Sequence, residues 1–202
     1  MPHQKTLSPE NALERLIEGN ERYHQGRALH PRQTHHFRLF THAAQSPFAV
    51  ISTCSDSRVP AEIIFDQGVG DLFVVRTAGN ISSASQIGSI EYAVEYLGAK
   101  LVLVMGHTNC GAVTAVAEGL QVNGNIKELL RLIRPAVQKV AAEHNQEPIE
   151  SWLSEAIKAN VKQSIHDLLS QSPFLNQKIE QKEIKVVGAL YHIISGNIEI
   201  LD

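Results

Sequence analysis

Two short motifs bring together residue types that bind metals and activate water. The first is Cys54-Ser55-Asp56-Ser57-Arg58, and the second is His107-Thr108-Asn109-Cys110-Gly111. Thiolate and imidazole ligands suit Zn²⁺, and the His-x-x-Cys spacing lets both side chains reach one ion. The motifs therefore predict a zinc site, with one ion per chain held by Cys54, His107 and Cys110.

The four candidate ligands leave three interpretations open. Asp56 would either complete a closed structural site or leave the fourth metal position to water in a catalytic site. Alternatively, Cys54 and Cys110 would form a disulfide or redox pair. Arg58 favours catalysis, because a guanidinium two residues after Asp56 can hold that carboxylate off the metal in a charge-assisted pair.

In the catalytic interpretation, Asp56 is a gate that Arg58 holds open. Zinc with a vacant position lowers the pKa of its water from about 15.7 toward ~7 and so produces hydroxide near neutral pH. Asp56 would accept the hydrogen bond of that hydroxide and orient it. Since two thiolates offset the charge of the ion, we expect a less acidic water than on three neutral histidines, and an activity that rises with pH.

Both motifs directly follow apolar segments that predict buried strands. Short β-prone runs of this kind are typical of strands covered on both faces. The predicted strands are 47–53, 72–76, 101–105, 184–193 and 197–201. Ligands of parallel sheets bind beyond the carboxyl ends of the strands, where both motifs would lie.

Apolar residues at helical spacing predict the helices between these strands. They run from Ser8 to about Tyr23, up to Gly98, over 110–118, over 126–140 with a kink or break at Pro135, and from about 152 to before Pro173. Segment 24–42 is rich in histidine and poor in aliphatic residues, which predicts an irregular connection or extended arm.

Alternating strands and helices predict an α/β fold. We expect a mostly parallel central β-sheet flanked by helices, with an N-terminal helical arm and an additional C-terminal strand. The 202 residues suffice for a single domain, in which 1–42 form the N-terminal helix and arm and 43–202 the zinc-binding core.

Composition and charge exclude several classes of protein. Hydrophobic residues make up 43% of the chain, which is typical of a globular protein, and no apolar run approaches the ~18 residues of a membrane span. The net charge of −3 and the lack of a basic stripe argue against nucleic-acid binding. The N-terminus lacks the apolar region of a secretory signal, so a cytoplasmic location is expected.

With CSDSRV, HTNCG and a β-α-β unit between them, the sequence resembles the β-class carbonic anhydrases over about residues 10 to 195. The resemblance implies zinc-dependent reversible hydration of CO2 to bicarbonate and a proton. The zinc ligands of the family fall on Cys54, His107 and Cys110, and its aspartate-arginine dyad falls on Asp56 and Arg58. In closed members of the family, the aspartate binds zinc and blocks water.

The plant-like branch of this family supplies three further matches, at Gln45, Phe73 and Tyr92. The resemblance implies that Gln45 donates a hydrogen bond to substrate or product, and that the two aromatic residues form an apolar wall for CO2. Taken alone, the three residues would be a polar turn residue, a core aromatic and a helix-packing tyrosine. The family also implies a homodimer or a dimer-based tetramer, with the first helix packing across a partner and pocket residues shared between chains.

Some relatives carry an inhibitory bicarbonate pocket made by a tryptophan and an arginine. Arg76 matches the arginine, but Ile51 stands at the tryptophan position, so this regulation is not expected here. Two alternative functions remain: hydrolysis of CS2 or COS by the same nucleophile, and a non-catalytic zinc protein with Asp56 locked on the metal. The presence of Arg58 and of the three pocket residues argues against the locked form.

Overall fold

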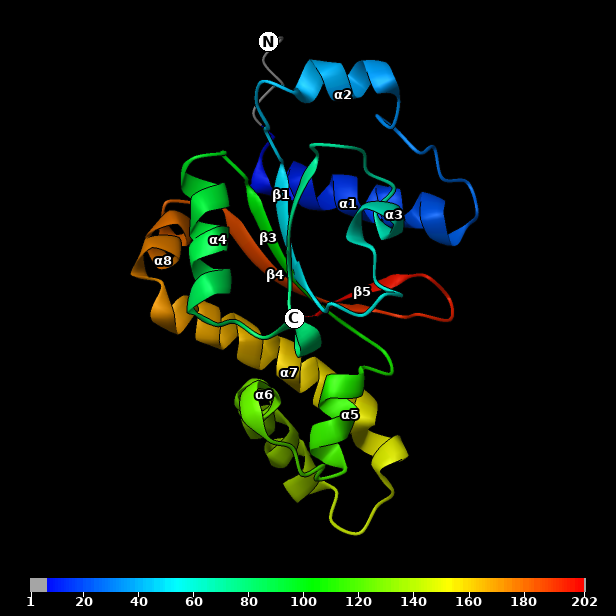
Figure 1. The fold of residues 1–202 in the computed structure, drawn as a ribbon, viewed down its shortest axis with the longest axis vertical. Helices are drawn as coiled ribbons and strands as arrows, with labels where there is room; N and C mark the ends of the chain where they lie inside the picture. The colour runs from blue at the N-terminus through cyan, green and yellow to red at the C-terminus, as the bar shows by residue number, and fades with distance from the viewer. Residues whose placement is uncertain (1–6, 202) are drawn as a thin grey trace.

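The computed structural model describes residues 7–201 as an α/β fold around one five-stranded sheet (Figure 1). The strand order is β2-β1-β3-β4-β5; the first four strands run parallel, and β5 is antiparallel to β4. The strands are β1 (Ala49–Thr53), β2 (Leu72–Arg76), β3 (Leu101–His107), β4 (Lys185–Tyr191) and β5 (Ile198–Leu201). The predicted sheet and its additional C-terminal strand are thus confirmed.

Helices cover both faces of this sheet (Figure 1). They are α1 (Pro9–His24), α2 (His35–Thr41), α3 (Ala61–Ile64), α4 (Ala84–Glu95), α5 (Gly111–Ala117), α6 (Gly124–Glu143), α7 (Ile149–Gln171) and α8 (Pro173–Glu180), with a 3₁₀ turn η1 at Ala78–Asn80. Side chains of β1 alternate between two cores, because successive strand residues point to opposite faces. Ile51 packs in a core with Leu16 of α1, and Val50 packs in the other with Ile90 of α4.

The chain reverses its direction of travel across the sheet between β1 and β3. From β1 it moves outward to β2, and α4 then carries it back past β1 to β3 on the other side. Such a switch point leaves a crevice at the carboxyl ends of the two central strands, where ligands bind in open α/β sheets. Cys54 directly follows β1 and His107 ends β3, so both predicted motifs lie at this point.

Two predicted segments differ from the structure. The predicted irregular stretch contains helix α2, whose first turn is capped because the Thr34 hydroxyl accepts a hydrogen bond from the Phe37 amide at 3.3 Å. The predicted break at Pro135 does not divide α6, which runs as one helix. Pro135 and Arg131, whose carbonyl loses its partner, are both exposed, so water can satisfy that carbonyl.

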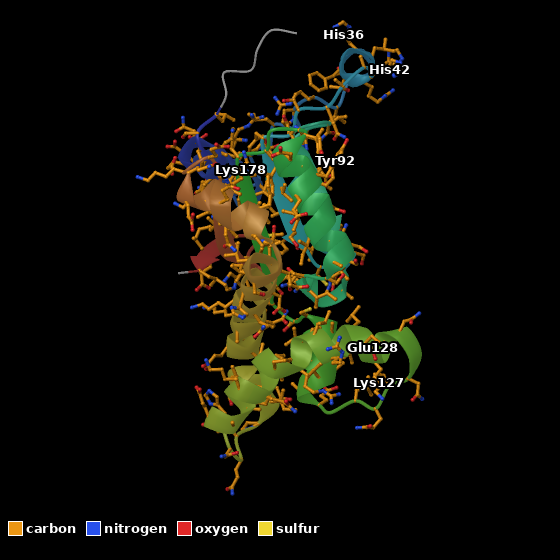
Figure 2. All side chains as sticks on the ribbon, turned by 90° about the vertical axis from the view of Figure 1, so that its left-hand side faces the viewer. His36, His42, Tyr92, Lys127, Glu128 and Lys178 are labelled. Carbon is orange, nitrogen blue, oxygen red and sulfur yellow. The ribbon has the colours of Figure 1, made fainter. Side chains whose placement is uncertain are left out.

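The predicted N-terminal segment contributes two helices, α1 and α2. Helix α1 is a layer of the core, since Ala12 and Leu16 are completely or almost completely buried against the sheet of the same chain. Helix α2 itself lies at one end of the molecule, as the positions of His36 and His42 show in Figure 2, whereas the segment before it is held to the chain by the ion pair of Arg32 with Asp71. No helix within residues 7–201 is long and apolar enough to cross a membrane.

Candidate metal centre

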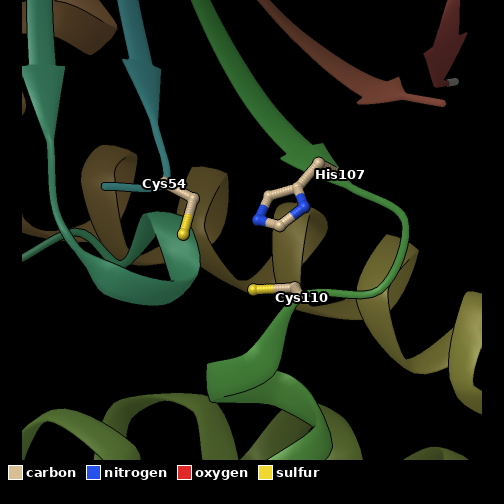
Figure 3. A group of neighbouring side chains, drawn as sticks. All are labelled: Cys54, His107 and Cys110. Carbon is tan, nitrogen blue, oxygen red and sulfur yellow. The ribbon is translucent and has the colours of Figure 1, made fainter. Parts of the chain in front are cut away.

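Three buried side chains converge at the switch point between β1 and β3 (Figure 3). Cys54 follows β1, His107 is the last residue of β3, and Cys110 is the N-cap of α5. One ligand atom from each residue, two sulfurs and a ring nitrogen, lies within 4.8 Å of the others. The structure thus brings the three predicted ligands together.

The histidine ring is oriented as a metal ligand requires. Its Nδ1 lies 2.9 Å from the carbonyl oxygen of Thr108, so this nitrogen carries the proton and donates it to the carbonyl. The other nitrogen, Nε2, is then free to bind a metal through its lone pair. Nε2 is buried and has no hydrogen-bond partner within the described chain. An unpaired buried polar atom is unfavourable, so a cation at this place suits the site.

The two thiols also have the properties of metal ligands. Hydrogen bonding with Cys110 lowers the pKa of Cys54, and the same contact together with burial raises the pKa of Cys110. The pair therefore favours one negative charge, and a divalent cation would allow both sulfurs to ionise. The donor set of two sulfurs and one imidazole fits Zn²⁺. Both cysteines are free in the structure, which therefore shows no disulfide between them.

Asp56 is paired with Arg58 beside this cluster. The Arg58 Nε donates to Oδ1 at 2.9 Å and Nη2 donates to Oδ2 at 2.7 Å, which forms a two-point contact. These hydrogen bonds hold the pKa of Asp56 well below its usual range. Oδ2 of Asp56 lies 3.9 Å from Nε2 of His107, so the carboxylate borders the cluster while Arg58 holds it.

Arg76 and Gly79 shape the loop that carries Cys54. Arg76, at the end of β2, donates to the carbonyl oxygens of Cys54 at 3.1 Å and Asp56 at 2.6 Å. The Gly79 amide donates to the Cys54 sulfur at 3.3 Å. Gly79 has φ 70°, and a Cβ on it would lie 2.4 Å from Ile133, so the position requires glycine. Gly79 was not predicted as a site residue, because its only signal in the sequence is a Gly-Asn pair shortly after a strand.

The three predicted pocket residues lie at the opposite end of the sheet in the same chain. Phe73 pairs with Val50, and Cys54 is about 13 Å further along β1 at the usual rise per residue. Tyr92 is in the last turns of α4, with its ring 6.4 Å from that of Phe73. Gln45 is exposed in the segment that enters β1. The chain therefore brings Phe73 and Tyr92 together but does not bring the three residues to its own metal cluster.

Comparisons with known proteins agree on one family. A family model described as carbonic anhydrase matches residues 49–198. Carbonic anhydrase 2 of Mycobacterium tuberculosis is 37% identical over 199 residues, covering 96% of this chain and 94% of the relative. A carbonic anhydrase of Mycolicibacterium smegmatis is 36% identical, covering 96% of this chain and 93% of the relative.

Solved structures give the same result. A structure from a study of two tetrameric β-carbonic anhydrases of the filamentous ascomycete Sordaria macrospora matches with a TM-score of 0.76 at 26% identity, covering 95% of this chain and 97% of the other. A β-carbonic anhydrase of Aspergillus fumigatus matches with a TM-score of 0.75 at 28% identity, covering 96% and 90%. The likeness thus extends over the whole α/β fold.

Proposed function

The chain belongs to the β-class carbonic anhydrases, and we propose that it catalyses the reversible hydration of CO2 to bicarbonate and a proton at a zinc ion held by Cys54, His107 and Cys110. The observation that carries this proposal is the buried cluster of three ligand atoms with a carboxylate held beside it. Zinc bound there supplies a Lewis acid that lowers the pKa of water, so that hydration proceeds near neutral pH.

Asp56 and Arg58 are proposed to orient the reacting water. The two-point contact with Arg58 keeps the Asp56 carboxylate ionised and fixes its direction. In this position Asp56 accepts a hydrogen bond from the water, whose lone pair then points at the carbon of CO2. A carbon–oxygen bond forms, one C=O double bond opens to an oxyanion, and the water proton leaves to buffer, which gives bicarbonate. The pairing of Asp56 with Arg58 supports the catalytic form over the form locked on zinc.

The pocket residues are proposed to act on the metal centre of a partner subunit. Tyr92 is 48% exposed and Tyr96 is 76% exposed on α4, so an aromatic surface is available for a second copy. Gln45 would donate to a substrate oxygen there, and Phe73 and Tyr92 would line the CO2 site. A homodimer or dimer-based tetramer would satisfy this arrangement, in line with the tetrameric enzymes of Sordaria macrospora. The cytoplasmic location stays a prediction.

Mixing two inactive variants tests whether the pocket is shared between chains. Cys110→Ser removes a zinc ligand and keeps the pocket, whereas a chain with Gln45→Ala and Tyr92→Ala keeps the zinc site. If the pocket acts on the partner, a mixed dimer has one intact site. We expect activity to recover to about a quarter of the wild-type value after random exchange of subunits. No recovery in confirmed mixed dimers would place each pocket with its own chain.

Stopped-flow CO2 hydration by zinc-loaded protein at pH 7 and pH 8.5 tests the proposed activity. We expect rapid turnover that increases with pH, because more of the reacting water is ionised at higher pH. Zinc-bound protein that hydrates no CO2 at either pH would contradict the proposal. Turnover of CS2 or COS by that same preparation would then support the alternative hydrolase.

A further inference from the structure

The Cys54 sulfur accepts two backbone hydrogen bonds, one from its own loop and one from a distant segment of the chain. The Asp56 amide, in the same loop, donates at 3.4 Å. The Gly79 amide donates at 3.3 Å from the η1 turn, which is 25 residues away along the chain. The second bond therefore depends on whatever fixes the η1 peptide in place, and Gly79 itself offers no side chain to anchor it.

Asn160 of α7 provides that anchor. Its Nδ2 donates to the Gly79 carbonyl oxygen at 2.8 Å, and its side chain is almost completely buried. Helix α7 packs against η1, β3 and α5, the elements that surround the metal cluster (Figure 1). A buried amide on α7 thus holds the residue that contacts the metal-binding sulfur.

The other half of the Asn160 amide, its oxygen, has no polar partner within the described chain. Its Oδ1 is buried and has no hydrogen-bond partner among residues 7–201. A buried polar atom without a partner is unfavourable; an apolar side chain of similar size, such as leucine, would avoid that cost but would leave the Gly79 carbonyl without this donor. Its neighbours on α7, Ile157 and Val161, are buried and apolar. Within residues 7–201, the Asn160 side chain therefore makes one hydrogen bond, to the Gly79 carbonyl.

We propose that Asn160 is a positioning residue for the metal centre: through Gly79 it directs an N–H group at the Cys54 sulfur and so strengthens the hold of that ligand on zinc. Hydrogen bonds to a metal-bound sulfur stabilise its negative charge and fix its direction, and loss of such supporting contacts typically lowers metal affinity 10–100-fold. The inference rests on the proposed zinc site and assigns a function to a residue that contacts neither metal nor substrate.

Asn160→Leu tests the proposal, with Ser164→Ala as the matched control. Ser164 lies one turn later on α7 and is equally buried. Its hydroxyl faces the η1 residue Asn80 at 3.5 Å, which is too long for a strong hydrogen bond, and does not contact Gly79. We expect Asn160→Leu to weaken zinc binding about 10–100-fold in competition with a chromophoric chelator, and Ser164→Ala to stay within about twofold of wild type. If Asn160→Leu does not fold, the smaller Asn160→Ala takes its place.

A spectroscopic readout separates positioning from a general loss of packing. In the Co²⁺-loaded protein, loss of an N–H donor raises the energy of the sulfur electrons, so the thiolate-to-cobalt absorption should move to longer wavelength in Asn160→Leu and stay in place in Ser164→Ala. In ¹¹³Cd-loaded wild-type protein, the Gly79 amide proton should show coupling to cadmium through the Cys54 sulfur. This measurement requires no variant.

The outcomes distinguish this inference from the proposed function. A wild-type protein that binds neither zinc nor cobalt would overturn the proposed function itself. Wild-type protein that binds zinc, with Asn160 variants that match it in affinity and absorption, would overturn only the role of Asn160. Equal weakening by Ser164→Ala, or a Gly79 proton without coupling to cadmium, would do the same.

Discussion

Replacing Asp56 with asparagine is expected to lower CO2 hydration by about 100-fold or more while zinc stays near one ion per chain. Asparagine keeps the shape of the side chain, but it lacks the charge with which Arg58 pairs at two points and the carboxylate that accepts a hydrogen bond from water. Positioned groups of this kind contribute typically 10²–10⁴-fold to a rate. Stopped-flow hydration and metal analysis of the same sample give both quantities.

Asp66→Asn is the matched control for this change. Asp66 also pairs with an arginine, Arg22, at 2.7 Å, but it holds the segment after α1 through the Leu29 and His30 amides, away from the metal cluster. We expect Asp66→Asn to lower stability and to leave the turnover of folded protein unchanged. Wild-type turnover by Asp56→Asn would rule out the proposed role of the carboxylate.

The pH profile adds a second test of Asp56. Hydrogen bonds from Arg58 hold the pKa of Asp56 well below its usual range, so the carboxylate is ionised at pH 7 and at pH 8.5 alike. The expected rise of activity over this range therefore does not come from its titration. It comes from ionisation of the water, so the pH at which activity rises should reflect the metal and its ligands.

The cluster of Cys54, His107 and Cys110 could be predicted because these residues lie at or just after the ends of strands in the sequence. Cys54 and His107 each directly follow an apolar strand, and the carboxyl ends of parallel neighbours meet at one edge. Cys110 comes three residues after His107 and therefore lies close to it. Strand pattern, the parallel arrangement of the sheet and the His-x-x-Cys spacing were sufficient to expect these three residues together.

Contacts between distant segments could not be predicted in this way. Asn160 and Gly79 are 81 residues apart, and no pattern in either segment pairs an amide on α7 with a turn after β2. Helix α2 was missed for the opposite reason. It is only seven residues long, and its histidines and aromatic residues show no helical periodicity, so its capped first turn at Thr34 is the main local signal.

The location of Gln45, Phe73 and Tyr92 depends on information that one sequence does not contain. Their types match a substrate pocket, yet the sheet places Phe73 far along the strand direction from Cys54. Within one chain β2 and α4 pack together, yet Tyr92 remains 48% exposed. We propose that a partner subunit brings these residues to a metal centre, and the mixing experiment tests this.

Replacing His107 with glutamine is expected to remove zinc and, with it, all measurable CO2 hydration. The ring nitrogen Nε2 is buried and unpaired within residues 7–201, and the Nδ1 contact with the Thr108 carbonyl directs it at the two sulfurs. Glutamine lacks this aromatic donor, and two thiolates alone leave the ion with too few protein ligands. Metal analysis after dialysis should give less than about a tenth of an ion per chain.

Thermal unfolding with and without a chelator shows whether the lost metal was part of the folded state. A ligand bound at about 1,000 times its dissociation constant stabilises a protein by about 4.1 kcal/mol, so chelation should lower the Tm of wild type. The Tm of His107→Gln should not respond to chelator. His144→Gln is the control, since this partly buried histidine pairs with Glu147 and Glu155 and should keep both zinc and activity. Zinc retained at one ion per chain in His107→Gln would refute the assigned ligands, whereas loss of zinc here and its retention in Asp56→Asn would separate the residues that hold the metal from the residue that uses it.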